Sequence, residues 1–557
     1  MPIEVHKPSK NLLRSIQTRF ALQRDDWNDY SFQTLYHLHY RPGPALDEVT
    51  YIGGVKILKL DQTESHGSLI TEEFSQLGSD FASVGTSLDY YQRLNEIPVK
   101  RRALIMRALN DVVAHPELVD EFSEERGWKK SLFRDNRDWR EFLTDARALY
   151  EGNFGALADL ENQFQYKPPG ATDFIEFDFS APTPDWYIGG YRRLGPKRKK
   201  TLLPERMIVL VGRNGAGKST LLSRLAHVAF ASPQTRATKE MINTFGKLEP
   251  NSIGFMRVIT ISYSAFDSFI VPGVDARDLS QITDDLERGE GRFVFCGLRD
   301  IVAEVRDDVE AAAKNANSES DEEVRVDRRT STHLKSVNAL ADEFAQQLTR
   351  IRKNDKLELF DAALAILAED PSFSQLKNQL GDLGTATRSV TKRLFLDWST
   401  GHKIALHVIA SLVANATPRS LILFDEPEAH LHPPLTAALT SAVRLVLTEV
   451  NAFCIVATHS PVLLQETLAR HVRYVRRNGK SLSIDTPKLE TFGENVGVLS
   501  YDSFGLTASA SDYHKILDYL IQGSDGIEEI ETAFQPGLSG QARAYVLSKL
   551  AKQRKAT

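Results

Sequence analysis

The chain has 557 residues, enough for about three or four domains of ordinary size. Its formal net charge of −6 argues against a generally basic nucleic-acid-binding surface. Its two cysteines, Cys296 and Cys454, each lie in an apolar run, and no run of about 18 apolar residues occurs, so we expect a soluble, cytoplasmic protein without disulfides or membrane contact.

The first part of the chain predicts strands followed by helices. Residues 31–40 and 50–60, separated by Arg-Pro-Gly-Pro, predict a hairpin or two early strands. From residue 72 to about residue 165 the apolar spacing becomes helical, as at Ile105, Leu109 and Val112. Tyr90 and Tyr91 could stack on a base, but core packing is the favoured interpretation beside neighbouring leucines.

Residues 207–220, MIVLVGRNGAGKST, predict a phosphate-binding loop between a strand and a helix. The glycines lack Cβ atoms, so backbone N–H groups can surround a polyphosphate, and the helix opening at Lys218 points its positive end at the same anion. Lys218 would reach the β- and γ-phosphates, and the Ser219 hydroxyl would ligate Mg²⁺. The predicted ATP-binding residues of this loop are Gly212, Arg213, Asn214, Gly215, Ala216, Gly217, Lys218, Ser219 and Thr220.

Two features before the loop have open interpretations. Six of the nine residues 192–200 are basic and could contact nucleic acid, although a solvated loop is the plainer explanation. Trp186, Tyr187 or Tyr191, about thirty positions before Lys218, could stack on adenine, and Tyr187 is our candidate among them.

After the loop, residues 258–262 predict a strand that ends before Ser264 and Asp267. Residues just beyond the carboxyl end of such a strand face the ligand, so these two could contact Mg²⁺ or the attacking water, with an ordinary polar turn as the equal alternative. Residues 292–299 predict another strand. Residues 309–332 contain almost no large apolar side chains and suggest a mobile connector, and helical spacing returns over residues 334–380.

Three short stretches complete the predicted site. Ser399 and Gly401 begin a helix over residues 404–413, where a hydroxyl and free N–H groups offer a second anion-binding terminus. The buried strand of residues 421–424 is followed by Asp425, predicted to hold Mg²⁺, and by Glu426, predicted to polarise the attacking water. The strand of residues 453–457 leads to His459, which can donate to the γ-phosphate.

These stretches resemble the ATP-binding-cassette and SMC-like ATPases. GRNGAGKST is similar to their Walker A motif, LILFDE to Walker B with its catalytic glutamate, and His459 to the switch histidine. WSTGHK is similar to the signature sequence but has His402 where a glutamine is usual, and the usual glutamine after residues 258–262 is missing. The resemblance implies an α/β P-loop NTPase of ABC/SMC-head type with helical insertions. It also implies a homodimer or higher homo-oligomer, in which Ser399 and Gly401 complete the ATP site of a partner subunit.

The stretch DEPEAHLHP followed by THSP resembles the OLD-type and related prokaryotic defence ATPases. Residues 491–506, with GSDFASVGTSLDYY near the front, are similar to the ATPase subunit (PtuA-like) of Septu anti-phage systems, some of which accompany retrons. That resemblance implies a partner HNH-type nuclease and, in retron versions, a reverse transcriptase with its DNA–RNA hybrid. A metal site at Glu428, His430 and His432 is the less favoured interpretation of the same motif.

Residues 473–484 predict a hairpin about Asn478 and Gly479, and residues 516–521 a further amphipathic helix. Only 98 residues follow His459, and we expect no nuclease domain there. The expected division is 1–71, N-terminal strands of the ATPase lobe; 72–168, helical insertion; 169–308, ATPase domain with Walker A; 309–390, mobile connector and helical subdomain; 391–510, ATPase domain with signature, Walker B and switch histidine; 511–557, C-terminal helical segment.

The sequence therefore predicts an Mg²⁺-dependent ATPase that senses or regulates, and that controls a separate nuclease in anti-phage defence. One rival is an SMC- or RecF-like repair ATPase acting directly on DNA, against which stands the lack of a long heptad coiled coil. Another is a scaffold that binds ATP with negligible turnover. A transporter ATPase is disfavoured by the helical insertions and by DEPEAHLHP.

Overall fold

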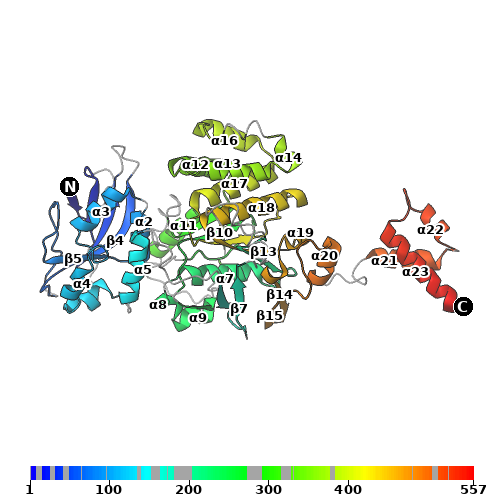
Figure 1. Cartoon of the computed structure of the whole chain (residues 1–557), viewed down its shortest axis with the longest axis horizontal. Helices are drawn as coiled ribbons and strands as arrows, with labels where there is room; N and C mark the ends of the chain where they lie inside the picture. Colours follow the sequence, from blue (N-terminus) through cyan, green and yellow to red (C-terminus); the bar gives the residue numbers. More distant parts are fainter. Residues whose placement is uncertain are drawn as a thin grey trace, which may run out of the picture.

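The computed structural model shows an N-terminal α/β unit, a central sheet covered by helices, and a C-terminal group of helices (Figure 1). It describes residues 2–7, 16–25, 32–41, 49–63, 66–95, 97–134, 139–151, 163–171, 173–180, 203–231, 233–251, 253–272, 291–314, 328–329, 331–376, 380, 383–479, 481–504, 512–524 and 526–556.

The N-terminal unit is a five-stranded sheet with its own helices and core. Its strands follow the order β1 (Ile3–His6), β2 (Phe20–Arg24), β3 (Leu35–Tyr40), β4 (Thr50–Lys59) and β5 (Phe81–Gly85), antiparallel except for β1 and β2. Its helices are α2 (Leu88–Asn95), α3 (Val99–Ala108), α4 (Glu117–Phe122), a π-helical turn η2 (Trp128–Leu132) and α5 (Trp139–Glu151). Leu38 and Val55 of the sheet share one core with Ile105 and Phe142 of the helices.

This unit differs from the expected division at residue 71. The strands expected within the ATPase lobe form a separate sheet, and β5 lies inside the stretch expected to be a helical insertion. The physical reason is that the apolar face of the early strands is covered by the helices that follow them in sequence. The expected core packing of Tyr90 and Tyr91 is confirmed, since neither side chain is exposed.

A buried carboxyl group in this unit predicts a pH-dependent stability. Asp111 accepts hydrogen bonds from the Tyr91 hydroxyl at 3.2 Å and the Val113 N–H at 2.9 Å, and burial raises its pKa to about 7. A pKa raised by folding means that the folded protein binds the proton more tightly than the unfolded chain does. We therefore expect the free energy of unfolding to fall as pH rises from about 4 to about 7, by roughly 1.4 kcal/mol per unit of pKa difference at most.

Urea unfolding monitored by tryptophan fluorescence at several pH values measures this trend, and Asp111→Asn is the matched variant. Asparagine keeps an acceptor oxygen but does not titrate, so the fall between pH 4 and pH 7 should shrink in the variant. An identical pH profile in both proteins would contradict the assignment.

The central sheet has seven strands in the order β11 (Phe293–Gly297), β10 (Val258–Ser262), β12 (Leu421–Asp425), β13 (Phe453–Thr458), β8 (Met207–Val211), β14 (Val472–Asn478) and β15 (Ser481–Asp485). The strands from β11 to β14 run parallel, and β14–β15 is the expected antiparallel hairpin. Because the parallel strands are in register, their carboxyl ends lie at one edge of the sheet.

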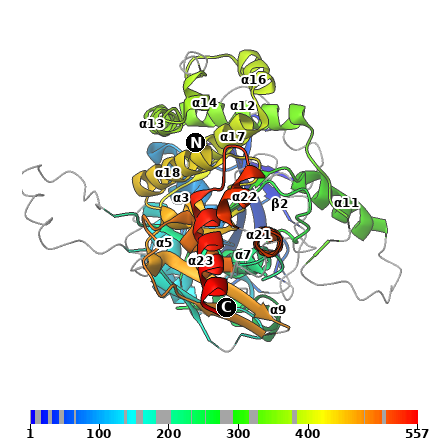
Figure 2. The same ribbon diagram turned by 90° about the vertical axis from the view of Figure 1, so that its right-hand side faces the viewer.

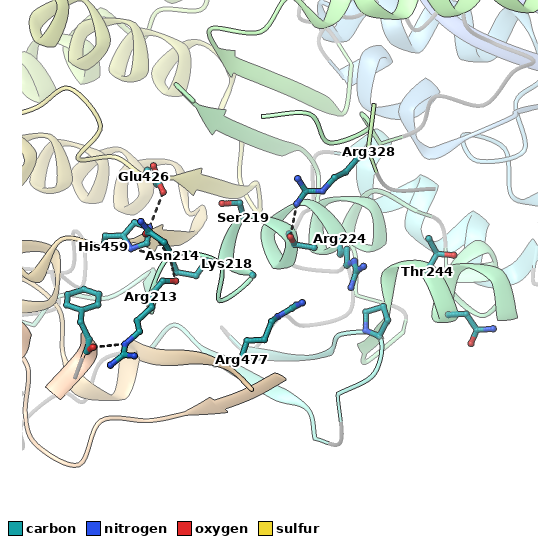
Figure 3. A pocket seen from close by; sticks show the side chains of 16 residues that line it. Arg213, Asn214, Lys218, Ser219, Arg224, Thr244, Arg328, Glu426, His459 and Arg477 are labelled. Atoms are coloured by element: carbon teal, nitrogen blue, oxygen red, sulfur yellow. Dashed lines mark hydrogen bonds and ion pairs between the residues drawn. The ribbon is translucent and has the colours of Figure 1, made fainter. Parts of the chain in front are cut away.

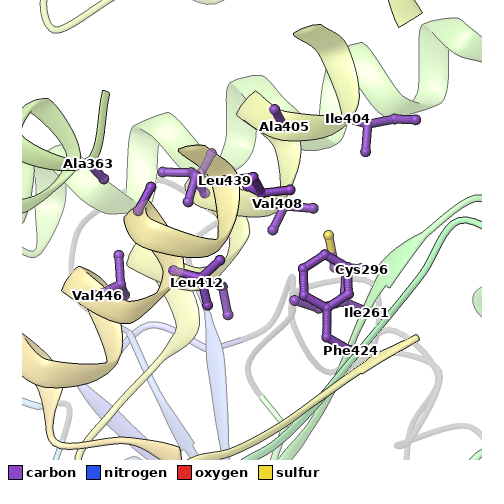
Figure 4. Close-up of a cluster of buried hydrophobic side chains, with 14 of the residues drawn as sticks. Ile261, Cys296, Ala363, Ile404, Ala405, Val408, Leu412, Phe424, Leu439 and Val446 are labelled. Carbon is purple, nitrogen blue, oxygen red and sulfur yellow. The ribbon is translucent and has the colours of Figure 1, made fainter. Parts of the chain in front are cut away.

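The sheet is buried on both faces, and alternate residues of each strand face opposite layers. Val209 of β8 packs with α17 (Thr400–Asn415) and α18 (Pro433–Val450), whereas Ile208 and Leu210 pack with α7 (Lys218–Phe230). Figure 4 shows the first layer, where Ile261, Cys296 and Phe424 of the sheet meet Val408 and Leu412 of α17. Both cysteines are buried free thiols, as expected.

Several smaller elements accompany the central sheet. A three-stranded sheet is ordered β7 (Ile175–Asp178), β6 (Gln163–Lys167) and β9 (Lys247–Glu249). Short helices α8 (Pro233–Arg236) and α9 (Lys239–Phe245) follow α7. In the chain, α19 (Pro461–Gln465) and a 3₁₀ turn η3 (Ala469–His471) precede the β14–β15 hairpin, and α20 (Val496–Phe504) follows it.

A helical subdomain lies above α17 (Figures 1 and 2) and contains α12 (Val337–Lys353), α13 (Leu357–Leu367), α14 (Pro371–Ser374) and α16 (Arg388–Asp397). The expected connector of residues 309–332 is partly wrong, because α11 (Ile301–Lys314) extends into it. The alanines and charged residues that suggested a connector are also good helix formers.

The C-terminal helices are α21 (Asp512–Gln522), α22 (Ile527–Thr532) and α23 (Gly540–Ala556), which enclose a small core of their own around Leu517, Ile530 and Val546. Among the described residues, no helix is both long and apolar enough to span a membrane.

Candidate functional site

The phosphate loop joins a buried strand to a helix at the carboxyl edge of the sheet. Gly215 and Gly217 have φ of +77° and +97°, conformations that favour glycine, and Gly217 caps the start of α7. A Cβ at Gly212 would lie 2.2 Å from the Val475 carbonyl oxygen, so only glycine lets the loop pass β14. The loop leaves its backbone N–H groups at the start of α7, where an anion is favoured.

Lys218 is buried beneath this loop, with 5% of its surface exposed. Its Nζ donates to the Gly212 carbonyl at 3.0 Å and lies 3.1 Å from His459 Nε2. Burial lowers the pKa of the amine, and the carboxylates of Glu426 and Asp425 oppose that shift. A polyphosphate entering the loop would give this ammonium group a stronger partner than a carbonyl oxygen.

Asp425 ends β12 beside Ser219, whose hydroxyl is hydrogen-bonded to its carboxylate. Burial raises the pKa of Asp425 to about 7, and its Oδ1 is a buried oxygen without a hydrogen-bond partner among the described residues. An unsatisfied carboxylate oxygen beside a hydroxyl suits Mg²⁺, which prefers oxygen ligands. These two residues therefore fit the metal, and Mg²⁺ bound here would neutralise charge on the phosphates.

Glu426 follows directly and points toward the loop (Figure 3). Its backbone has φ of +48°, rare for glutamate, and is held by its N–H donating to the Ala457 carbonyl at 2.8 Å. Oε1 lies 3.1 Å from His459 Nε2, and this hydrogen bond lowers the pKa of Glu426. A carboxylate kept ionised at the mouth of a phosphate pocket can accept a proton from water.

Glu428 fixes the backbone that carries His459. Its Oε1 accepts from the Thr458 hydroxyl at 2.8 Å and from the His459 N–H at 2.6 Å. In the sequence, the only role suggested for the Glu428 side chain is in the less favoured metal site with His430 and His432. Instead, His432 caps α18 by accepting from the Leu435 N–H at 3.3 Å, and no group of three metal-ligating side chains occurs among the described residues.

A pocket of about 1470 Å³ opens over the loop. Figure 3 shows Glu426 and His459 at one end, Lys218 and Ser219 in the middle, and Thr244 at the other end. The sequence did not predict Pro169, Arg224, Asn243, Thr244, Arg328, Arg477 or Phe504, which also line it. Arg224 lies on α7, about one and a half turns beyond the phosphate loop, whereas the others come from segments remote from the ATPase motifs, and nothing in their local sequence signals a site.

Ser264 and Asp267 lie outside the lining of this pocket. Ser264 Oγ accepts from the Phe266 N–H at 3.3 Å, as in an ordinary polar turn. Asp267 accepts from Arg299 at 3.1 Å, and the buried Arg299 also pairs with Glu304 at 2.5 Å. Asp267 nevertheless lines a small cavity of about 40 Å³ together with Ser219 and Asp425, the two predicted Mg²⁺ ligands.

The signature residues begin α17 as expected. Ser399 caps the helix by accepting from the His402 N–H at 3.4 Å, and a Cβ at Gly401 would meet the His430 carbonyl oxygen at 3.3 Å. Neither residue lines the pocket of its own chain. Tyr187 and the basic residues 192–200 lie outside the described residues.

The chain is similar to several known proteins. Residues 207–465 match the model of a family described as "AAA domain, putative AbiEii toxin, Type IV TA system". The chain is 29% identical over 563 aligned positions to Protein ea59 of Escherichia phage lambda, and the alignment covers 95% of each chain.

Similar solved structures include an Smc head bound to the C-winged helix domain of ScpA, with 12% identity and a TM-score of 0.25, covering 59% of this chain and 97% of that one. Another is the Smc head domain with an extended coiled coil from Pyrococcus furiosus, with 10% identity and a TM-score of 0.23, covering 58% and 96%.

Residues 207–465, which carry the phosphate loop, are similar to this family of AAA domains. The expected α/β P-loop NTPase fold class is confirmed by this match together with the parallel sheet and its phosphate loop, whereas the ABC/SMC-head type with helical insertions stays a prediction.

Proposed function

We propose that this protein binds and hydrolyses ATP with Mg²⁺, and that hydrolysis regulates a separate nuclease in anti-phage defence. The observation that carries the hydrolytic part is the meeting of Lys218, Glu426 and His459 around one pocket, with Glu426 Oε1 and Lys218 Nζ each 3.1 Å from the same imidazole nitrogen. His459 thereby links the phosphate-binding cation to the proposed base.

In the proposed hydrolysis each residue of the site has one role. The loop and Lys218 bind the phosphates, Ser219 and Asp425 hold Mg²⁺, and Glu426 accepts a proton from the attacking water. Ser399 and Gly401 do not line this pocket, so their predicted contact with ATP belongs to a second copy, and the proposed active form is a homodimer or a higher oligomer.

The regulatory part rests on resemblance rather than on the geometry of the site. The Septu-like segments favour an HNH-type nuclease partner, with a reverse transcriptase and its DNA–RNA hybrid in a retron context. The description of the matched family refers to a toxin and a toxin–antitoxin system, which agrees with a multicomponent role.

Phosphate release by the purified protein, alone and with DNA, RNA or the product of a neighbouring nuclease gene, tests the proposal. We expect turnover that changes when the nuclease is present. Stimulation by DNA alone would favour a repair ATPase, and absence of turnover under every condition would favour an ATP-binding scaffold.

Glu428→Ala should lower the rate of hydrolysis at saturating ATP about tenfold while leaving KM for ATP within about threefold. Its removal leaves the Thr458 hydroxyl and the His459 N–H without their acceptor, so the imidazole loses its fixed position. Steady-state phosphate release measures both constants. Glu428→Gln is the control, because its amide oxygen can accept the same hydrogen bonds; a loss as large as that of Glu428→Ala would contradict a positioning role.

A further inference from the structure

Two arginines from segments outside the ATPase motifs point into the nucleotide pocket. Arg328 belongs to the described residues 328–329 and 331–336 that precede α12 of the helical subdomain, and Arg477 belongs to β14 of the hairpin. Figure 3 shows them on opposite sides of the start of α7, with Ser219 and Lys218 between them and the catalytic end of the pocket.

Arg328 is held in place on three sides. Its backbone pairs with the segment that follows β10, since the Arg329 N–H donates to the Ser268 carbonyl at 2.7 Å and Arg328 forms a β-bridge with Phe269. Its guanidinium lies over the Phe269 ring, 4.5 Å from the centroid, and Nη2 donates to Thr220 Oγ1 at 3.2 Å. This positions a planar cation one residue beyond the predicted Mg²⁺ ligand Ser219, before any phosphate arrives.

Arg477 approaches from the other side. Its Nη2 lies 2.9 Å from where a Cβ on Gly217 would be, so the guanidinium rests on the phosphate loop itself. Its neighbour Arg476 instead pairs with Asp485 at 3.3 Å and lies over the Tyr474 ring, as alternation along a strand requires. Within the described residues no ion pair of Arg477 is found.

The charges in the pocket favour an anionic ligand at this point. Glu426 is the one carboxylate that lines the pocket among the described residues, and it lies at the far end, hydrogen-bonded to His459. Arginine provides a fork of N–H donors that matches phosphate geometry, and such charge-assisted hydrogen bonds are among the stronger ones in proteins.

We propose that Arg328 and Arg477 clamp the phosphate chain of the nucleotide, and that Arg328 couples occupancy of the pocket to residues 331–336 and so to the helical subdomain. The proposal rests on the ATP-binding function proposed above. Arg328, beside Thr220 and away from Glu426, serves the phosphate nearest the ribose, and Arg477 closes over the loop.

Displacement of a fluorescent ATP analogue by ATP and by ADP tests the clamp in the full-length protein. Arg328→Ala and Arg477→Ala should each weaken both affinities about tenfold or more, and the double variant should lose about the product of the two factors. Arg328→Lys and Arg477→Lys should recover part of each loss because they keep the charge. Arg476→Ala and the remote Arg388→Ala, which removes an exposed pair with Asp342, are matched controls with unchanged affinity.

Hydrogen–deuterium exchange tests the coupling. Saturating ATP should protect the amides of residues 331–340 in the wild type but not in Arg328→Ala, a difference that a purely structural role would not give. Wild-type affinity in both alanine variants overturns the clamp, and equal protection overturns the coupling. If the wild type itself binds no nucleotide, the proposed function fails instead, so the two failures are distinguishable.

Discussion

Glu426→Gln should reduce ATP hydrolysis at least about a hundredfold while ATP binding stays within about threefold of the wild type. Glutamine keeps an oxygen that can accept from His459 Nε2, at the position where Oε1 now lies 3.1 Å away. It cannot accept a proton from water, so the variant loses the base and little else. Single-turnover hydrolysis and equilibrium binding of a fluorescent ATP analogue measure the two effects separately.

Glu369→Gln, an exposed change in the helical subdomain, is the control for that variant and should leave both measurements unchanged. Light scattering adds a third readout, because a protein that retains ATP should accumulate as the closed dimer. Wild-type turnover in Glu426→Gln would remove the base assignment. A variant that holds ATP yet stays monomeric would contradict the shared site at Ser399 without affecting Glu426.

The parts of the site that the sequence placed correctly are those that depend on strand ends. Gly212, Asp425 and His459 each lie at or just beyond the end of an apolar run, and parallel strands bring their carboxyl ends to one edge. Strands that are buried on both faces of the sheet consist of continuous apolar residues, so they can be recognised in the sequence. The roles of these residues stay predictions, whereas their proximity is a property of the fold.

The parts that the sequence missed depend on which segments pack together. The strand-like stretches 31–40 and 50–60 predict strands but not the sheet that they join, so the expectation that they belong to the ATPase lobe is wrong. Arg328 and Arg477 reach the loop through a β-bridge and a hairpin, and neither contact has a local signature. Glu428 is close in sequence to two histidines, and only the structure shows that its Oε1 accepts a hydrogen bond from the His459 N–H.

Lys218→Ala should weaken ATP binding about a hundredfold or more and abolish measurable hydrolysis. The ammonium group is the buried cation of the loop, and charge-assisted hydrogen bonds to phosphate are worth roughly 1.5–3 kcal/mol each. Without a nucleotide the amine donates to the Gly212 carbonyl at 3.0 Å, so binding exchanges a weak partner for a strong one. Calorimetric titration with ATP and Mg²⁺ measures the loss directly.

Lys218→Met separates charge from packing, because methionine fills a similar volume without a cation. If charge is decisive, the methionine and alanine variants should lose ATP equally and keep melting temperatures close to the wild type without nucleotide. Lys129→Ala, exposed in the N-terminal unit, controls for a general loss of positive charge. ATP affinity retained in Lys218→Met would show that the loop N–H groups and the arginines suffice to hold the phosphates, and Lys218 would then act on His459 and Glu426 rather than on binding.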